Sequence, residues 1–337
     1  MFALAAGADT RPGGLQLTQA ARPFAPPPTP RTRGRAMSAA TTTYTRMNEI
    51  ADEIAFTLLG PVGATVGARP VAVADRRQRI VLALLVLAKG RVVPTATLVD
   101  AVWGDRPPLS ARTLVLLSVR SLRKAFRAAG HTRPLIVGGP AGYRLRTECA
   151  ASDVHAFDAL VAAAEEAATR GAADDASTLY AGALELWRGP AIDGVGGRVT
   201  EALAARLEER RTAVCHALLG LGEAQSAAGF VDEAEASLLP ALRAAEALGD
   251  LLLIAEANLA LGRLCRTFRR TARADHHLAA ARRAFRRAGS EAGELMALEE
   301  CAGEGETAPA LDLIPRQGGR PWRGMPDPWR GAPGSDA

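Results

Sequence analysis

Residues 92–146 constrain the fold more than any other stretch of this chain. A short helix is predicted over 96–102, and Pro107-Pro108 then break the chain. A basic helix follows over about 111–129, and the glycines and proline of 138–142 predict a hairpin turn between two short strands. Helix, turn, basic helix and hairpin in this order predict a winged helix, whose second helix enters the major groove of DNA.

Short strands and helix caps are predicted ahead of and within this stretch. Apolar and β-branched segments between glycines predict a small antiparallel sheet with strands at 55–59, 64–66 and 71–73. A further helix is predicted over 76–88. Three polar residues stand just before predicted helices, where a side-chain oxygen can accept a backbone N–H: Asp75, Thr95 and Ser110.

The charge of the chain differs sharply between its two halves. Residues 53–148 contain 15 Lys and Arg against 5 Asp and Glu, a net charge of +10, whereas residues 149–310 contain 16 against 25, a net charge of −9. A basic region joined to an acidic one favours nucleic acid as the partner of the first and proteins as partners of the second. A charged surface without any partner is the alternative interpretation.

Alanine dominates the chain from residue 152, and helices alternate there with glycine-containing turns. Helices are predicted at about 153–169, 173–187, 199–228, 231–248, 251–267 and 271–288. Two helix pairs resemble each other at an offset of 40 residues, since Ala234, Leu238, Ala241 and Gly249 align with Ala274, Leu278, Ala281 and Gly289. Small residues where helices cross, with one turn for each pair, predict stacked helical repeats.

Together these patterns predict a mostly α-helical chain in which a winged helix-turn-helix with a small β-sheet and a wing is followed by an α-helical tetratricopeptide-like repeat domain. We expect the winged helix at 53–148 and the helical repeats at 152–305. Residues 1–52 are rich in Ala, Pro, Thr and Arg without a lasting period, and residues 306–337 are rich in Gly and Pro. We therefore expect a disordered N-terminal arm and a disordered tail there.

The basic helix has two contrasting sides on a helical wheel. One side is apolar, and we expect it to be buried: Val115, Val119, Leu122 and Phe126. The opposite side carries Thr113, Arg120 and Lys124, with Arg123 and Arg127 at its edge. Such a helix fits a major groove about 12 Å wide, where guanidinium groups contact guanine O6 and N7 or grip phosphates.

Residues that flank the basic helix are further candidates for DNA contact. Arg106 and Arg112 lie near its start, and Arg144 and Arg146 lie on the predicted hairpin. Tyr143 on the same hairpin either stacks on a sugar or packs below the wing. Phosphate contacts of this kind position a protein, whereas base contacts specify the sequence.

Two leucines interrupt the polar side of the basic helix. Leu117 projects from the middle of the groove-facing side, and Leu116 lies on its flank. Three interpretations remain open. Leu117 contacts a thymine methyl group, or the leucines pack on a neighbouring domain or a second subunit, or the DNA contact has been lost.

These residues together resemble a known family. Residues 54–148 resemble the OmpR-type winged helix, and residues 152 to about 250 resemble the bacterial transcriptional activator domain that follows it in the SARP family of pathway-specific antibiotic regulators. The passages that carry the resemblance include Trp103-Gly-Asp-Arg-Pro-Pro108, Ser110-Ala-Arg112, Gly142-Tyr-Arg-Leu145 and Leu186-Trp-Arg-Gly-Pro190.

The resemblance implies a transcription activator that binds direct repeats in double-stranded promoter DNA and contacts RNA polymerase. A homodimer is left open. The groove-facing positions of the family fall on Thr113, Leu116, Leu117, Arg120 and Ser121, and the two leucines depart from the polar residues usual there. The alternative function is a protein-interaction scaffold with a degenerate winged helix that no longer reads DNA.

Other kinds of chemistry find no support in the sequence. No Cys-x-x-Cys pair occurs among Cys149, Cys215, Cys265 and Cys301, which favours a reducing cytoplasm over a zinc site or a disulfide framework. We expect Cys215 and Cys265 on buried helix faces. No apolar run reaches the roughly 20 residues that span a bilayer. No catalytic, cofactor-binding or P-loop motif occurs, so we expect neither an enzyme nor a bound cofactor or metal.

Overall fold

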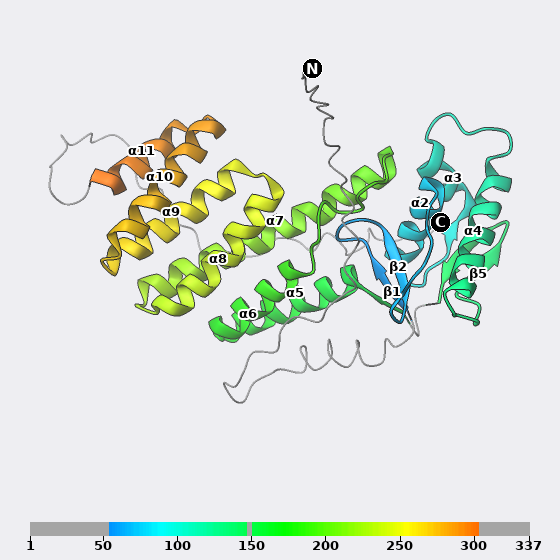
Figure 1. Ribbon diagram of the computed structural model, residues 1–337, viewed down its shortest axis with the longest axis horizontal. Helices are drawn as coiled ribbons and strands as arrows, with labels where there is room; N and C mark the ends of the chain where they lie inside the picture. Colours follow the sequence, from blue (N-terminus) through cyan, green and yellow to red (C-terminus); the bar gives the residue numbers. More distant parts are fainter. Residues whose placement is uncertain (1–53, 147–149, 303–337) are drawn as a thin grey trace, which may run out of the picture. The chain divides into compact units, whose positions relative to one another are not determined.

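A computed structural model of the chain describes residues 54–146 and 150–302. The predicted arm, the predicted tail and Cys149 lie outside these residues. We call residues 54–146 the N-terminal region and residues 150–302 the helical region. Figure 1 shows short strands and helices together in the first and a succession of helices in the second. The predicted fold class, a winged helix-turn-helix followed by helical repeats, is confirmed.

Four short strands form the first sheet, in the order β3-β2-β1-β7. They are β1 (Ile54–Thr57), β2 (Gly63–Val66), β3 (Arg69–Pro70) and β7 (Ala150–Ser152). β1 pairs antiparallel with β2, as predicted, but parallel with β7, which was not predicted. The predicted strand at 71–73 is wrong, because the chain pairs with β2 two residues earlier, at β3.

Three helices and a second sheet make up the rest of the N-terminal region. The helices are α2 (Arg76–Leu87), α3 (Thr95–Trp103) and α4 (Ala111–Ala128). The second sheet has the order β4-β6-β5 and contains β4 (Val93–Pro94), β5 (Ile136–Gly139) and β6 (Gly142–Leu145). β5 and β6 are the predicted hairpin, and β4 holds it against the start of α3.

One of the three predicted side-chain caps is confirmed. The Asp75 carboxylate accepts a hydrogen bond from the backbone N–H of Arg77 at 3.1 Å. Ser110 stands at the N-cap position of α4 but makes no side-chain cap bond. Thr95 is already the first residue of α3, and its hydroxyl donates to the Pro140 carbonyl at 2.7 Å, so it ties this helix to the hairpin turn instead.

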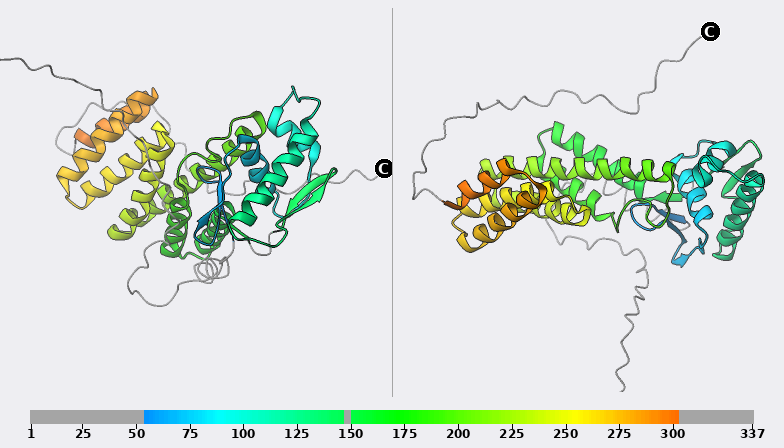
Figure 2. Two further views of the ribbon diagram at one scale, coloured as in Figure 1. Left: turned by 45° about the vertical axis from the view of Figure 1, so that its right-hand side comes forward. Right: turned by 90° about the horizontal axis from the view of Figure 1, so that it is seen from above.

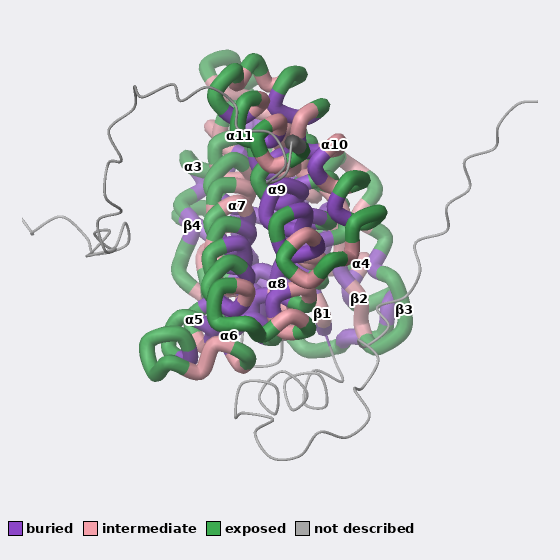
Figure 3. Tube along the Cα trace, turned by 90° about the vertical axis from the view of Figure 1, so that its left-hand side faces the viewer, coloured by how far each residue is buried: buried purple, intermediate pink, exposed green. Residues whose placement is uncertain are grey.

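The helical region contains seven consecutive helices among its described residues. They are α5 (Asp153–Thr169), α6 (Ala173–Glu185), α7 (Arg198–Ala227), α8 (Val231–Leu248), α9 (Leu251–Thr267), α10 (Thr271–Ala288) and α11 (Glu291–Ala302). Each of α5 to α10 packs on the helix that follows or precedes it, and buried residues line their facing sides (Figures 2 and 3). The six predicted helices are confirmed, and α11 was not predicted.

The repeat at an offset of 40 residues is visible in how α7–α8 and α9–α10 pack. Gly249 and Gly289 end α8 and α10 in the same left-handed conformation, with φ of 71° and 74°. Gly222 and Gly262 each meet a leucine of the partner helix. The aligned small and apolar positions are fully buried in both pairs: Ala234, Leu238 and Ala241, and Ala274, Leu278 and Ala281.

The close approach at Gly222 leads to a prediction about stability. A Cβ atom added there would lie 2.6 Å from both Cγ and Cδ2 of the fully buried Leu238. We expect Gly222→Ala to lower the free energy of unfolding by about 1–3 kcal/mol, because a buried leucine must shift. Gly220→Ala in the same helix is the matched control, since its Cβ meets nothing within 4 Å. It should raise stability by about 0.5–1 kcal/mol. Urea unfolding checks both, and equal effects would contradict the packing argument.

A buried carboxylate joins the two regions. Asp153, at the start of α5, accepts hydrogen bonds from the backbone N–H groups of Leu58 and Leu59 at 2.9 and 3.0 Å. It also accepts from its neighbour Val154 and pairs with the Arg188 guanidinium. Burial raises the pKa of Asp153 above its ordinary value, and these donors act in the opposite direction.

Backbone hydrogen bonds continue this seam beyond Asp153. The N–H of Arg188 donates to the Leu59 carbonyl at 2.7 Å, and the N–H of Ile192 donates to the Leu58 carbonyl at 2.8 Å. Trp187, beside Arg188, packs edge-on against Phe157 with ring centroids 5.7 Å apart. The passage Leu186-Trp-Arg-Gly-Pro190 therefore anchors the helical region to the residues that follow β1.

The two cysteines expected in the core are buried as predicted. Cys215 on α7 is 0% exposed and Cys265 on α9 is 2% exposed. Burial raises the pKa of the Cys215 thiol to about 12. A thiol of this kind stays protonated at neutral pH and acts as a small apolar side chain.

Candidate nucleic-acid interface

The apolar side of α4 fixes this helix on the N-terminal region. The four residues of the predicted stripe are all buried, with exposures of 0–2%: Val115, Val119, Leu122 and Phe126. The Phe126 ring meets the Phe56 ring of β1 edge-on at 6.0 Å between centroids. α4 also packs on α2 and α3. The opposite side of α4 is therefore held outward.

Most residues that the sequence placed on the outward side of α4 are exposed, but Leu116, one of the groove-facing positions, is half-buried. The following side chains are all exposed: Arg112, Thr113, Leu117, Arg120, Ser121 and Lys124. Within the described part of the chain, neither Arg120 nor Lys124 has an ion-pair partner, and α4 itself contains no acidic residue. We call these six residues the basic face. It is positively charged and free to bind an anion.

Arg123 has a different role from the arginines of the basic face. It is half-buried, and its Nε donates to the Ile136 carbonyl of β5 at 3.0 Å, so it tethers α4 to the hairpin. The sequence placed Arg123 only at the edge of the polar side. That edge position was the one sign that its side chain reaches sideways toward the hairpin.

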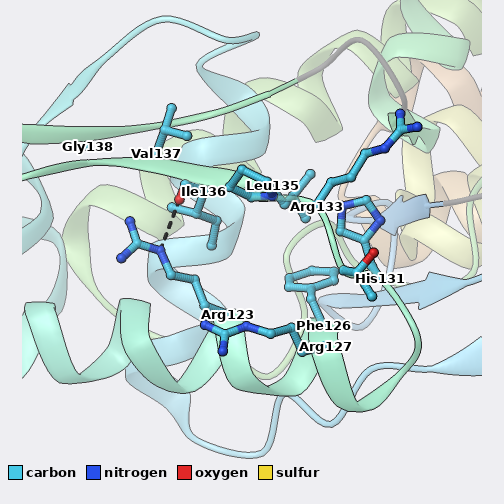
Figure 4. Close-up of a pocket in the computed structure, with 11 residues that line it drawn as sticks. Arg123, Phe126, Arg127, His131, Arg133, Leu135, Ile136, Val137 and Gly138 are labelled. Carbon is cyan, nitrogen blue, oxygen red and sulfur yellow. Dashed lines mark hydrogen bonds between the residues drawn. The ribbon is translucent and has the colours of Figure 1, made fainter.

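A shallow hollow lies between the end of α4 and β5 (Figure 4). Its volume is about 530 Å³, and Phe126, Leu135 and Ile136 contribute apolar lining. Figure 4 shows the side chains of Arg123 and Arg127 near one another beside it, with the Arg133 guanidinium apart from them. The arginines that line the hollow place further positive charge between α4 and the hairpin.

The hairpin depends on glycines at its turn. A Cβ on Gly138 would lie 2.3 Å from the Gly142 carbonyl oxygen, and a Cβ on Gly142 would lie 2.7 Å from the Val93 carbonyl oxygen. No other residue allows the three strands to approach so closely. The hairpin therefore holds the exposed Arg144 of β6 in a defined place beside β5, the strand that packs on α4.

The structure removes Tyr143 from the set of candidate DNA contacts. Its side chain is 2% exposed and belongs to the core, so of the two interpretations left open, packing below the wing is the one observed. Side chains alternate across a strand, and Tyr143 points inward where its neighbour Arg144 points outward. The alternation of β6 was the signal that separated these two residues.

The turn before α4 adds an exposed cation and an exposed leucine. Arg106 is exposed, as predicted for a phosphate contact. Leu109 has a relative exposure of 111%, the highest among the large apolar residues described. Leu109 has no signal in the sequence, because a lone leucine in a turn belongs to no periodic pattern.

The described residues offer no sign of a metal site or a membrane span. No group of three or more His, Cys, Asp or Glu among them is placed to hold a metal ion. No helix in residues 54–146 or 150–302 combines the length and the apolar character that a bilayer crossing needs.

The comparisons with known proteins match both regions. Residues 71–145 match the family "Transcriptional regulatory protein, C terminal", and residues 152–259 match the family "Bacterial transcriptional activator domain". The fold and the basic face thus define an OmpR-type winged-helix protein with an activator domain behind it. The chain belongs to the SARP-type family of transcriptional regulators.

Three relatives show how far the similarity extends. The chain is 35% identical to the regulatory protein AfsR of Streptomyces griseus over 61% of its own length and 20% of AfsR. It is 34% identical to the regulatory protein DnrI of Streptomyces peucetius over 56% of its length and 69% of DnrI. The solved structure of Mycobacterium tuberculosis EmbR, in complex with a low affinity phosphopeptide, matches 74% of this chain and 65% of EmbR with a TM-score of 0.55 and 28% identity. The chain thus spans a fifth of AfsR and about two thirds of DnrI and of the EmbR structure.

Proposed function

We propose that this chain binds promoter DNA through α4 and the β5–β6 hairpin and activates transcription. The basic face carries the proposal, because it is an outward cationic surface on a helix whose other side is fixed in the core, and its cations have no ion-pair partner within residues 54–146 and 150–302. Arg120 and Lys124 would contact base edges or phosphates in the major groove, and Arg112 and Arg106 would grip phosphates near the start of α4. Arg144 on the hairpin would contact a phosphate of the DNA backbone next to those that α4 contacts.

The proposal also includes the protein partners of the chain. The match to the bacterial transcriptional activator domain supports a role in activation. The proposal extends to a DNA site made of direct repeats and to a contact with RNA polymerase. The exposed Leu109 in the turn before α4 would be accessible to a protein while α4 lies in the groove. A homodimer, with one copy on each of two adjacent repeats, is the simplest oligomer that fits such a site.

A salt titration tests DNA binding directly. Neutralising phosphates releases condensed cations, so affinity falls steeply as salt rises. With about six phosphate contacts, we expect binding of the full chain to promoter fragments to weaken by roughly a thousandfold between 50 and 200 mM salt. Fluorescence anisotropy with labelled duplexes from the region upstream of the chain's own gene measures this.

The same titration separates the proposal from its alternative. A scaffold with a degenerate winged helix would show no binding to any promoter fragment at 50 mM salt, or weak binding that salt leaves unchanged. Either result would contradict the proposed function.

A further inference from the structure

We propose that Leu117 reads thymine in the bound DNA, through contact between its side chain and the C5-methyl group of the base. This inference rests on the proposed DNA-binding function and names a specificity-determining residue within it. Leu117 is 47% exposed and lies on the outward side of α4. It is the one large apolar side chain on the basic face as defined above.

The surroundings of Leu117 are those of a groove-reading residue. On a helix, residues three and four positions apart are neighbours, with Cβ atoms about 5–6 Å apart. Thr113, Arg120 and Ser121 stand at these spacings from Leu117, and all three are exposed. An apolar group framed by a cation and two hydroxyls matches the major-groove edge of DNA. There the thymine methyl is the one apolar group among hydrogen-bonding atoms, and phosphates flank the groove.

Packing within the chain does not account for Leu117. Its neighbour Leu116 is half-buried, and Leu114 on the preceding turn is half-buried as well. Leu117 alone of the three is exposed, and packing within residues 54–146 and 150–302 leaves 47% of it accessible. Any group that covers this accessible part comes from outside the described residues.

Charge favours DNA over a second copy of the chain that meets Leu117 through the same basic face. The basic face carries Arg112, Arg120 and Lys124, and α4 has no acidic residue to balance them. Two copies meeting through this face would bring six cations together around the leucines, which is repulsive. A duplex meets the same cations with phosphates and offers the leucine a methyl group.

Uracil substitution is the sharpest test, because deoxyuridine pairs as thymidine does and lacks only the C5-methyl. A preferred duplex is first selected by the full chain from a random pool, and each thymine in it is then replaced by uracil in turn. Burial of one methyl group predicts that, at one position of each repeat, uracil weakens binding of the unaltered chain about fourfold. In Leu117→Ala, uracil at this position should change binding by less than about twofold, the limit within which independent changes add.

Leu109→Ala is the matched control, since Leu109 is also an exposed leucine but lies outside the basic face. It should keep the full fourfold uracil effect. If the unaltered chain tolerates uracil at every position, or if Leu117→Ala keeps the uracil effect, the inference is wrong while salt-dependent DNA binding still supports the proposed function. If the chain selects no duplex at all, the proposed function fails and the inference fails with it.

Discussion

Replacing both Arg120 and Lys124 with alanine should weaken binding to promoter DNA by about a hundredfold or more. Each side chain is exposed and has no ion-pair partner among the described residues, so its charge is available to the ligand. Loss of one arginine that contacts a base costs about 1–3 kcal/mol, and loss of one phosphate contact lowers the salt slope by about one. The double variant should therefore bind more weakly and depend less on salt.

Fold stability separates this effect from simple damage. Both positions lie on the outward side of α4, and alanine is a good helix former, so the urea unfolding curve should not move. Arg283→Ala with Arg287→Ala is the matched control, because these residues are exposed cations on α10, far along the chain from α4. It should leave DNA affinity within about twofold. Equal losses of DNA affinity in both double variants would indicate a general effect of positive charge and would contradict DNA binding by the basic face.

Replacing Asp153 with alanine should lower the free energy of unfolding by about 3–5 kcal/mol. The substitution leaves the N–H groups of Leu58 and Leu59 without their acceptor, in residues that are 0–1% exposed. It also leaves Arg188 without its carboxylate partner. Because Asp153 joins the two regions, the loss should be accompanied by separation of their unfolding transitions.

Urea unfolding of the full chain, followed by tryptophan fluorescence and by circular dichroism, measures this effect. Asp232→Ala is the matched control, since Asp232 lies in the first turn of α8 and is exposed. It should cost less than about 1 kcal/mol. A similar small cost at Asp153 would contradict its role as the buried link between the regions.

Local patterns in the sequence were sufficient to predict most of the helices. The stripe of α4, from Val115 to Phe126, repeats at three and four residues, and the structure buries each of its members. The 40-residue offset likewise predicted two similar helix pairs, because small residues mark where helices cross. These signals lie within one element or between adjacent elements, so they can be read along the chain.

Contacts between distant segments could not be predicted in this way. β7 pairs with β1 across nearly a hundred residues, and its sequence Ala-Ala-Ser has no strand character of its own. In the sequence, Asp153 falls at the start of a predicted helix. Acidic side chains are common there because they interact favourably with the helix dipole, so nothing marks this one as special. Its role emerges only when the end of β1 is brought beside it.

The same difference between local patterns and distant contacts decides which parts of the candidate interface could be predicted. Helical periodicity placed Arg120 and Lys124 on the outward side of α4, where the structure has them. The alternation of β6 places Tyr143 and Arg144 on opposite faces, but which of the two faces the core is fixed only when β6 pairs with β4 and β5. The Arg123 tether to Ile136 was missed for the same reason.

A hydroxyl-radical footprint on the DNA upstream of the chain's own gene tests the central claim most directly. At 50 mM salt, the full chain should protect short segments repeated in the same orientation, and the Arg120→Ala, Lys124→Ala variant should protect none at the same concentration. Absence of protection by a chain that unfolds cooperatively, or equal protection by the variant, would contradict the assignment of α4 as the DNA-reading helix.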